Sequence, residues 1–204
     1  MIFECNCNYC KMNTFMWELN NSEVWIEIPK NGSYNLKQLK FNYDSRYSVE
    51  SQPNSKIHKI TKIDKSKHKT GFVILRNPID RFKSLLSHYF INGSRLSMGS
   101  DWLKLIKAEY VDASNIADIV LDNWAVIGSI KEPHHFNSQK SFIPNEFFEI
   151  ESKFYDLKHL SSIFGVNSNV NSSNSSKIQL TENNLNQLHN LYTSDFELYE
   201  NFVR

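Results

Sequence analysis

The stretch VWIEIPKNGSYNLKQL, residues Val24–Leu39, passes from an apolar run through a turn into a helical pattern. Residues 23–28 alternate and carry β-forming side chains, which predicts a strand. A strand that leads through a tight turn into a helix leaves backbone N–H groups pointing outward at the positive end of the helix dipole. Gly32 allows the backbone to approach a ligand closely, Lys30 supplies a compact charge and Ser33 a hydroxyl. The stretch therefore predicts a site for a bound phosphate.

The same turn has a second explanation that needs no ligand, namely a loop with an exposed lysine. It is not the P-loop of a nucleoside triphosphatase, because the G-x-x-x-x-G-K-[ST] spacing is missing. A second anion signal elsewhere in the chain is needed to choose between these explanations.

The stretch LRNPIDRFKS, residues 75–84, repeats the pattern of buried strand, turn and helix. The preceding run GFVIL is short, continuous and apolar, which is typical of a buried parallel strand. Asn77 is a good N-cap, and Pro78 suits the first helical position. Arg76 at the strand end can bind a phosphate through two parallel hydrogen bonds, and Ser84 lies about two helical turns further on.

This second stretch also has an alternative explanation without a ligand. Arg76 and Arg81 would pair with carboxylates such as Asp80, and Ser84 would be a surface residue. Each stretch is ambiguous alone, but the two together are much stronger evidence for an anion site.

Length and composition limit the class of protein. The 204 residues predict one domain, and the 40% hydrophobic and 13% aromatic content is typical of a folded globular chain. A formal net charge of +1 gives no global basic field, so nucleic acid is not the expected partner and any anion site is local. No apolar run approaches the roughly 20 residues of a membrane span, and the N-terminus does not resemble a secretion signal. We expect a cytoplasmic protein.

The three cysteines, Cys5, Cys7 and Cys10, all lie in the first ten residues. A zinc site needs a fourth ligand at close spacing, and none follows nearby. The sequence therefore favours free thiols and no metal. A site shared between chains, or completed by a distant histidine, is the alternative.

The rest of the chain alternates strand and helix patterns, which argues for an α/β domain with three layers around a parallel sheet. Strands are predicted at 45–50 and 147–151, and loop with some helix at 52–70. Helices are predicted at about 101–109 and 114–122, at 153–165 ending at Gly165, and at 182–202 with Thr181 as its cap. Residues 123–145 are predicted to be irregular, and residues 166–177 a polar surface loop.

The two anion stretches resemble the two nucleotide motifs of sulfotransferases that use 3′-phosphoadenosine 5′-phosphosulfate (PAPS). IPKNGSYNLK is similar to the 5′-phosphosulfate loop P-K-[TS]-G-[GT]-[TS], and LRNPIDRFKS to the 3′-phosphate motif R-[DN]-P-x-x-R-x-x-S. The two occur in the family's order. The arginine motif is the most specific part of the resemblance.

Later segments resemble the carbohydrate branch of this family. HHFNSQKSFI, residues 134–143, is similar to its H-[WF]-x-P-Q segment, with Ser138 where proline is usual. FFEIESKFYDLKHLSSIFG resembles its strand, glutamate and helix block, and LYTSDFELYENF resembles its terminal Y-x-x-D-[FY]-x-[LI]-[FY] helix. The resemblance covers about residues 23–202 of a single domain at 23–204, and residues 1–22 lie outside it.

The resemblance implies a P-loop-like sulfotransferase fold and transfer of a sulfuryl group from PAPS to an acceptor hydroxyl. The 5′ end of PAPS would be held by Lys30, the backbone of Asn31 and Gly32, Ser33, and the backbone of Tyr34. Its 3′-phosphate would be held by Arg76 and Ser84. Lys30 would also stabilise the phosphate oxygen that gains charge as the sulfur–oxygen bond breaks.

The family's base is a histidine or a glutamate, and its place in this chain is left open. Gln38 stands where some branches have a glutamate. The candidates are His135, His58 and Glu50, while His134, His68, His88, His159 and His189 are interpreted as structural or solvated.

The implied partner is a carbohydrate or glycolipid acceptor. Tyr34 is bulkier than the small residue usual at its position, and it would shape the acceptor site. The compact chain implies an open acceptor site or one completed by a second subunit in a homodimer. Two alternatives are a nucleotide-binding protein without turnover and a kinase-like phosphotransferase, against which the missing Walker spacing argues.

Overall fold

The structure is a computed structural model that describes residues 2–3, 15–19, 22–33, 36–42, 56–93, 95–165 and 174–203. Several features of interest in the sequence lie outside these residues: Cys5, Cys7, Cys10, Tyr34, the predicted strand at 45–50 with Glu50, and residues 166–173 of the polar loop.

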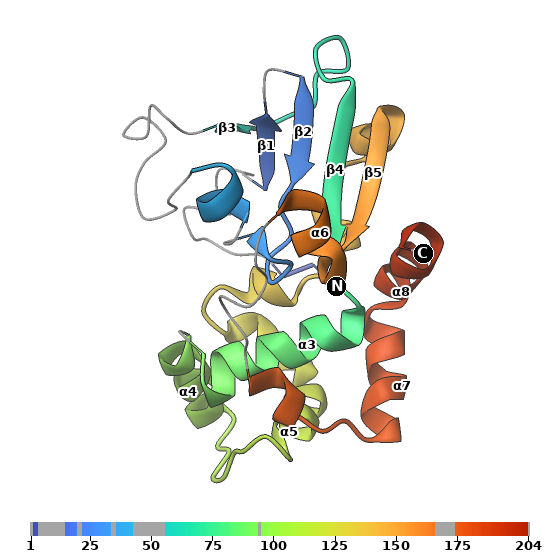
Figure 1. Ribbon diagram of the computed structural model, residues 1–204. Coiled ribbons are helices and arrows are strands. Elements are labelled where there is room, and N and C mark those ends of the chain that lie inside the picture. The colour runs from blue at the N-terminus through green and yellow to red at the C-terminus, as the bar shows by residue number, and fades with distance from the viewer. Residues whose placement is uncertain are drawn as a thin grey trace.

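A five-stranded mixed sheet in the order β3-β1-β2-β4-β5 forms the upper half of the molecule (Figure 1). Its strands are β1 (Met16–Leu19), β2 (Glu23–Ile26), β3 (Ile57–Ile60), β4 (Thr70–Leu75) and β5 (Glu151–Asp156). β2, β4 and β5 pair in parallel, whereas β1 is antiparallel to both of its neighbours. The carboxyl ends of β2 and β4 therefore lie side by side, which brings together the turns that follow them.

The inner strands β1, β2 and β4 are buried on both faces, which explains their short apolar runs. On one face, alternate strand residues pack with two helical segments: Trp17, Trp25, Phe72 and Ile74 with Leu36 and Leu160. On the other face, the intervening residues pack with the segments that follow residue 140 and with the last helix: Val24, Ile26, Val73 and Leu75 with Phe147 and Leu198. The α/β class predicted from the sequence is confirmed.

The helices are mostly short. The α-helices are α3 (Pro78–Leu86), α4 (Leu96–Leu105), α5 (Ile116–Asp122), α6 (Leu160–Phe164), α7 (Glu182–Leu191) and α8 (Thr193–Phe202). Shorter or irregular turns are η1 (Leu36–Lys40), η2 (Ser87–Ile91), η3 (Trp124–Ser129), η4 (Pro133–Phe136), η5 (Lys140–Phe142), η6 (Asn145–Glu149), η7 (Leu157–His159) and η9 (Asn174–Lys177).

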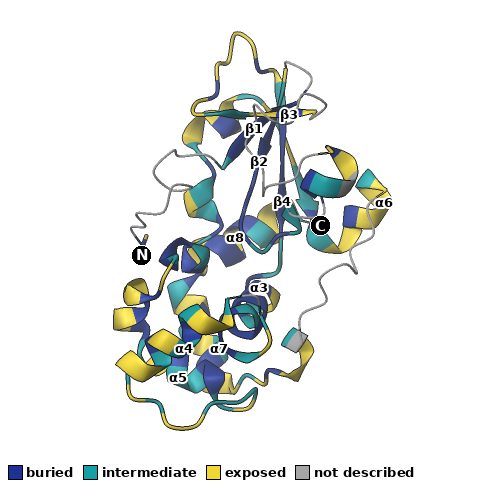
Figure 2. Ribbon diagram, turned by 90° about the vertical axis from the view of Figure 1, so that its left-hand side faces the viewer, coloured by how far each residue is buried: buried dark blue, intermediate teal, exposed yellow. Residues whose placement is uncertain are grey.

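The largest group of helices lies beyond the carboxyl ends of β2 and β4 rather than on a face of the sheet. Figure 1 shows α3, α4, α5 and α7 gathered there, and α3 is largely buried in Figure 2. An aromatic-rich core fills this group: Phe82, Leu85, Tyr89, Trp102, Val120, Trp124 and Phe136. The arrangement leaves the turns after β2 and β4 between the sheet and the helices.

Local signals placed several elements correctly. β4 and α5 are confirmed, and so is α3, whose N-cap Asn77 accepts hydrogen bonds from Ile79 N and Asp80 N. Thr181 caps α7 through a capping box, and Gly165 ends α6 with a φ of 66°. The predicted helix at 182–202 is interrupted at Tyr192, which separates α7 from α8.

Other predictions were wrong. The strand predicted at 147–151 is largely η6, and the helix predicted at 153–165 begins as β5. β3 lies in the segment predicted as loop with some helix, and the helix predicted at 101–109 begins at Leu96.

The first 22 residues contribute to the fold although the resemblance does not reach them. β1 pairs with β2 and β3, and Phe3 packs in the helical core against Trp124. Among the described residues, no helix is long and apolar enough to cross a membrane.

Candidate anion site at the ends of β2 and β4

The turn after β2 has an unusual backbone. Lys30 and Gly32 both have left-handed conformations, with φ values of 71° and 77°. A left-handed lysine is strained, since its Cβ crowds the backbone, and such strain is found mostly at functional sites. For Gly32 the structure gives a second reason besides the conformation. A Cβ on Gly32 would come within 2.7 Å of Leu157 Cδ1 and 3.1 Å of Leu160 Cδ2.

Asn31 fastens this turn to the next strand. Its Nδ2 donates to the carbonyl of Ile74 at 2.8 Å and to Oε1 of Gln139 at 2.6 Å. Asn31 and Gln139 are almost fully buried, at 2% and 0% exposure. The resemblance assigned a role only to the backbone of Asn31. Its side chain is a structural link between the turn, β4 and the segment before η5.

Arg76 joins the two predicted anion motifs directly. Its Nη1 donates to the carbonyl of Lys30 at 3.2 Å, although the two residues are 46 positions apart. Its backbone is held by Gln139, which accepts from Arg76 N at 3.0 Å and donates to Arg76 O at 2.8 Å. The guanidinium of Arg76 is only partly buried. The arginine and the lysine therefore lie in one cluster.

Arg81, the second arginine of this motif, binds backbone carbonyls of other segments. It is 2% exposed and donates to three backbone carbonyls, those of Pro29 at 3.2 Å and of His135 and Asn137 at 2.9 Å each. The planar guanidinium suits this task because its donors point in fixed directions. The sequence left open that Arg81 pairs with a carboxylate such as Asp80. In the structure its hydrogen bonds go to these backbone carbonyls instead.

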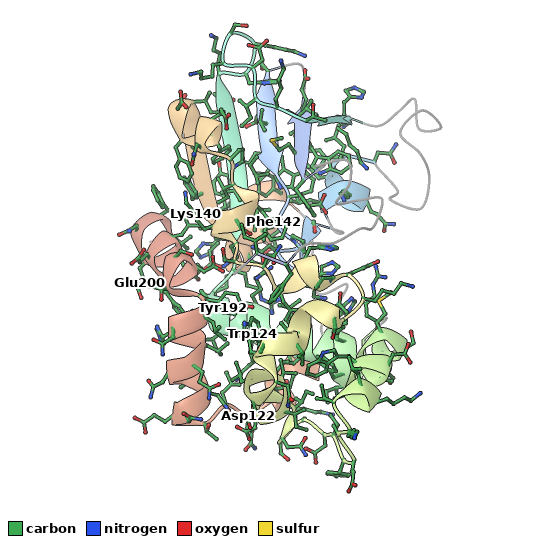
Figure 3. All side chains as sticks on the ribbon, turned by 180° about the vertical axis from the view of Figure 1, so that it is seen from behind. Asp122, Trp124, Lys140, Phe142, Tyr192 and Glu200 are labelled. Atoms are coloured by element: carbon green, nitrogen blue, oxygen red, sulfur yellow. The ribbon has the colours of Figure 1, made fainter. Side chains whose placement is uncertain are left out.

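The last two helices hold the segment from His134 to Lys140 in place. Asp195 of α8 accepts hydrogen bonds from Gln139 N at 2.8 Å and from Lys140 N at 3.0 Å. Tyr192 donates to the carbonyl of Phe136 at 2.8 Å. Figure 3 shows Lys140 and Phe142 at the level where the sheet meets the helices, with Tyr192 just below them.

The cluster holds four cationic side chains, and carboxylates lie near three of them: Asp80 near Arg76, Asp195 near Arg81, and Glu132 paired with Arg95. Burial lowers the pKa of Lys30 to about 8, and the charges of Arg76, Arg81 and Arg95 contribute further. Burial also lowers the pKa of Arg76, which the neighbouring carboxylate of Asp80 partly offsets. No described carboxylate forms an ion pair with Lys30. An ammonium that has cationic neighbours and no ion-pair partner among the described residues is suited to bind an anion.

Three histidines lie close to these cations. Burial lowers the pKa of His88 to about 4, helped by Lys30 and Arg95, and it lowers the pKa of His134 to about 4, helped by Arg95 and Arg81. The pKa of His135 is also well below its usual value, first through burial and then through His134 and Arg95. All three are therefore neutral at pH 7. His88 and His134, interpreted as structural from the sequence, belong to the same group of charges as Lys30.

The other predicted site residues are placed as follows. Ser33 follows Gly32 and is partly buried. Ser84 is 3% exposed on α3, and within the described chain no hydrogen bond connects its hydroxyl to Arg76 or to the turn. Its role toward a 3′-phosphate stays a prediction. Tyr34 and Glu50 lie outside the described residues.

His58 lies away from the cluster. β1 pairs Glu18 with both His58 and Val24, so His58 lies in the row of the sheet that contains Val24. From Val24 the chain runs roughly 13 Å to the start of the turn, at about 3.3 Å per residue. In addition, β1 lies between β3 and β2. His58 is exposed, and the structure does not bring it together with Lys30.

Sequence reasoning missed the residues that connect the site, although signals for them were present. Gln139 is the last residue of the segment similar to H-[WF]-x-P-Q, and Tyr192 and Asp195 are the first and fourth of the terminal Y-x-x-D pattern. Nothing in the sequence reveals that these residues contact one another. Among the described residues, no group of histidines and acidic residues could hold a metal ion.

No protein-family model matches this chain, and no match is found among curated proteins or among solved structures.

Proposed function

We propose that this protein transfers a sulfuryl group from PAPS to a hydroxyl of a carbohydrate acceptor, and that its α/β domain is a sulfotransferase fold related to P-loop proteins. The observation that carries the proposal is the hydrogen bond from Arg76 Nη1 to the carbonyl of Lys30. It joins the arginine of the 3′-phosphate-like motif to the lysine of the 5′-phosphosulfate-like motif. A nucleotide with anionic groups at both ends fits such a double site.

The connections among the four similar segments add support. Gln139 bonds to Asn31 and Arg76, and Asp195 bonds to Gln139. The turn, the arginine motif, the H-F-N-S-Q segment and the terminal helix are thus one hydrogen-bonded unit. If the four similarities had arisen by chance, there would be no reason for the four segments to contact one another in the fold.

The chemistry requires positive charge where the leaving phosphate gains negative charge. Lys30 would supply it, because its ammonium has cationic neighbours and no described carboxylate partner. The turn's backbone, with Gly32 and Ser33, would bind the same end of the nucleotide, and the remaining donors of Arg76 would bind the other. Removing Lys30 would lower the rate on the order of 10²–10³-fold.

A nucleotide-binding protein without turnover is the second candidate. It is favoured by the position of His58, which lies far from Lys30 and cannot serve as the base there. The two candidates make the same prediction for binding and differ in whether bound PAPS is consumed when an acceptor is present.

The first experiment is calorimetric titration with the desulfated product, 3′-phosphoadenosine 5′-phosphate, beside 5′-AMP and ATP. We expect the bisphosphate to bind best and Arg76→Ala to remove that preference. Lys83→Ala is the matched control, because Lys83 is a partly exposed cation of α3, the helix that follows Arg76. A bisphosphate that binds no better than AMP would contradict the proposal.

The second experiment measures transfer of labelled sulfate from PAPS to a panel of polysaccharides and glycolipids. Transfer that Lys30→Met abolishes supports the enzyme. Tight binding of the bisphosphate without consumption of PAPS across the panel supports the binding protein instead.

A further inference from the structure

Tyr89, Glu132 and His135 form a compact hydrogen-bonded group beside the cation cluster. The hydroxyl of Tyr89 lies 2.7 Å from His135 Nδ1 and 3.2 Å from the carbonyl oxygen of Glu132. The same carbonyl oxygen lies 3.3 Å from His135 Nδ1. Tyr89 is fully buried in η2, and the side chain of His135 keeps 16% of its surface exposed.

Counting protons in this group selects one tautomer of His135. The Glu132 carbonyl can only accept, and it faces both the tyrosine hydroxyl and Nδ1. With the proton on Nδ1, His135 donates to Tyr89 Oη or to Glu132 O, and Tyr89 donates to Glu132 O. With the proton on Nε2, Tyr89 must donate to Nδ1, and the carbonyl, which also accepts from His135 N at 3.4 Å, receives no proton from either side chain. The Nδ1-protonated form therefore makes two hydrogen bonds within this group where the Nε2-protonated form makes one, and it is favoured for that reason.

Nε2 of His135 is then a free base. No described residue forms a hydrogen bond with Nε2, because the ring's bonds are all made through Nδ1. Tyr89 and Glu132 therefore leave the basic nitrogen for a group from outside the protein.

The backbone and the side chain of Glu132 both contribute to the position of His135. Its φ of 61° is left-handed, which turns its carbonyl toward His135 and Tyr89. Its carboxylate makes two bonds of 3.1 Å to the guanidinium of Arg95, and Oε2 lies 3.9 Å from His135 Nδ1. Arg81 further holds the His135 backbone by donating to its carbonyl at 2.9 Å.

We propose that Tyr89 and the Glu132 carbonyl hold His135 in its Nδ1-protonated tautomer, so that Nε2 serves as the base for the acceptor hydroxyl. This inference rests on the proposed sulfuryl transfer and deepens it, because it selects one base and names Tyr89 and Glu132 as positioning residues. Arg81 donates to the carbonyls of both His135 and Pro29, which places the backbone of His135 beside the turn that carries Lys30.

The step balances as follows. The acceptor oxygen forms a bond to sulfur, and the bond between sulfur and the bridging oxygen of PAPS breaks. The electron pair of that bond stays on the departing phosphate, whose charge Lys30 stabilises. The hydroxyl proton moves to His135 Nε2. The imidazolium so formed keeps its proton on Nδ1, which donates to Tyr89 Oη or Glu132 O, and the nearby Glu132 carboxylate stabilises its charge.

The test begins with the resting protein and needs no activity. Nitrogen-15 NMR of protein with labelled histidine distinguishes a protonated Nδ1 from a protonated Nε2, and the signals of His135 are assigned by their loss in His135→Gln. We expect the proton on Nδ1. A proton on Nε2 would overturn the proposal whatever the protein's activity.

Tyr89→Phe tests the positioning role. The variant removes an acceptor for the imidazolium and keeps the ring in the core. We expect kcat to fall about tenfold with KM unchanged, which is part of the roughly 10²–10⁴-fold that a positioned base contributes, and the pKa of His135, followed by NMR, to fall further. His134, His88, Arg95 and Glu132, which also face the ring, are unchanged. Tyr110→Phe, which alters an exposed hydroxyl bonded to Asp112, is the matched control.

A purely structural tyrosine would lower stability and leave both kcat of the folded fraction and the titration of His135 unchanged, which would overturn the positioning role. A wild type with the expected tautomer but no sulfuryl transfer would overturn the proposed function and the base role with it, while the tautomer assignment would stand.

Discussion

The side-chain amide of Gln139 lies against the backbone of Arg76 and pairs with both of its polar groups. Nε2 donates to Arg76 O at 2.8 Å, and Oε1 accepts from Arg76 N at 3.0 Å. The same Oε1 accepts from Asn31 Nδ2 at 2.6 Å. One fully buried amide therefore sets the spacing between the turn after β2 and the turn after β4.

Gln139→Ala is expected to weaken the fold and the anion site together. It leaves Arg76 N, Arg76 O and one donor of Asn31 without their partner, and each unpaired buried group costs about 1–3 kcal/mol. The free energy of unfolding in urea should fall by at least about 2 kcal/mol, and bisphosphate affinity should fall as well. Gln179→Ala, at an exposed position, should leave both unchanged. A Gln139→Ala protein with unaltered affinity would contradict the linking role.

Arg81 should tolerate no replacement, including lysine. Its guanidinium donates to the carbonyls of Pro29, His135 and Asn137 at once, and a single ammonium on a flexible stem cannot reproduce that geometry. We expect Arg81→Lys and Arg81→Met each to lower the free energy of unfolding by about 3 kcal/mol or more. Lys83→Met on the same helix is the control and should change it little. Stability of Arg81→Lys equal to that of the wild type would refute this role.

Gly32 and Gly165 form a matched pair for separating backbone strain from packing. Both have positive φ, at 77° and 66°, but a Cβ on Gly165 meets nothing within 4 Å. Gly165→Ala should cost only the strain, about 1–2 kcal/mol. Gly32→Ala adds a contact of 2.7 Å with Leu157 Cδ1 and should cost clearly more. Bisphosphate affinity should drop only for Gly32→Ala, and equal effects of the two variants would contradict the packing argument.

Anion binding should be coupled to protonation of Lys30. Because its pKa in the free protein is about 8, a bound anion that raises this pKa makes the complex take up a proton near pH 8.5. Calorimetry in buffers of different ionisation enthalpy should show this uptake, and Lys30→Met should lose it. A binding enthalpy that is the same in all buffers would contradict the placement of Lys30 at the anion.

The same pKa predicts how stability depends on pH. An unfolded lysine keeps its usual pKa of 10.5, so between pH 8 and 10.5 the unfolded chain binds more protons than the folded one. Stability contributed by this group therefore rises with pH across that window and is lowest below pH 8. Lys30→Met should stabilise the free protein at pH 7, and the gain should disappear by pH 10.5. If the gain in the free energy of unfolding were the same at every pH, the lowered pKa of Lys30 would be contradicted.

Elements with strong local signals could be predicted from the sequence. The apolar run GFVIL, the cap at Asn77 and the proline after it define β4 and α3 without reference to the rest of the chain. The capping box at Thr181 and the glycine at 165 act in the same way. These signals are local because the groups that satisfy the helix ends lie within a few residues of them.

Elements decided by distant packing could not be predicted. The run FFEI reads as a strand, but Phe147 lies over Gly71, where a Cβ would come within 2.7 Å of its ring, and the segment forms η6. The next residues, Ser152–Asp156, pair with β4 instead of continuing as a helix. Their apolar side chains suit either structure, so the open edge of β4 decided the outcome.

By itself, the sequence determined that the chain has two strand–turn–helix units, each with a cationic residue in its turn, because strand, turn and cap signals are properties of adjacent residues. Only the tertiary structure decided that these turns meet, and that Gln139, Arg81 and Asp195 connect them. Those contacts join buried polar groups more than 50 residues apart, such as Gln139 and Arg76. No local pattern specifies them, because the partner of a buried hydrogen bond is known only when both segments have been packed in space.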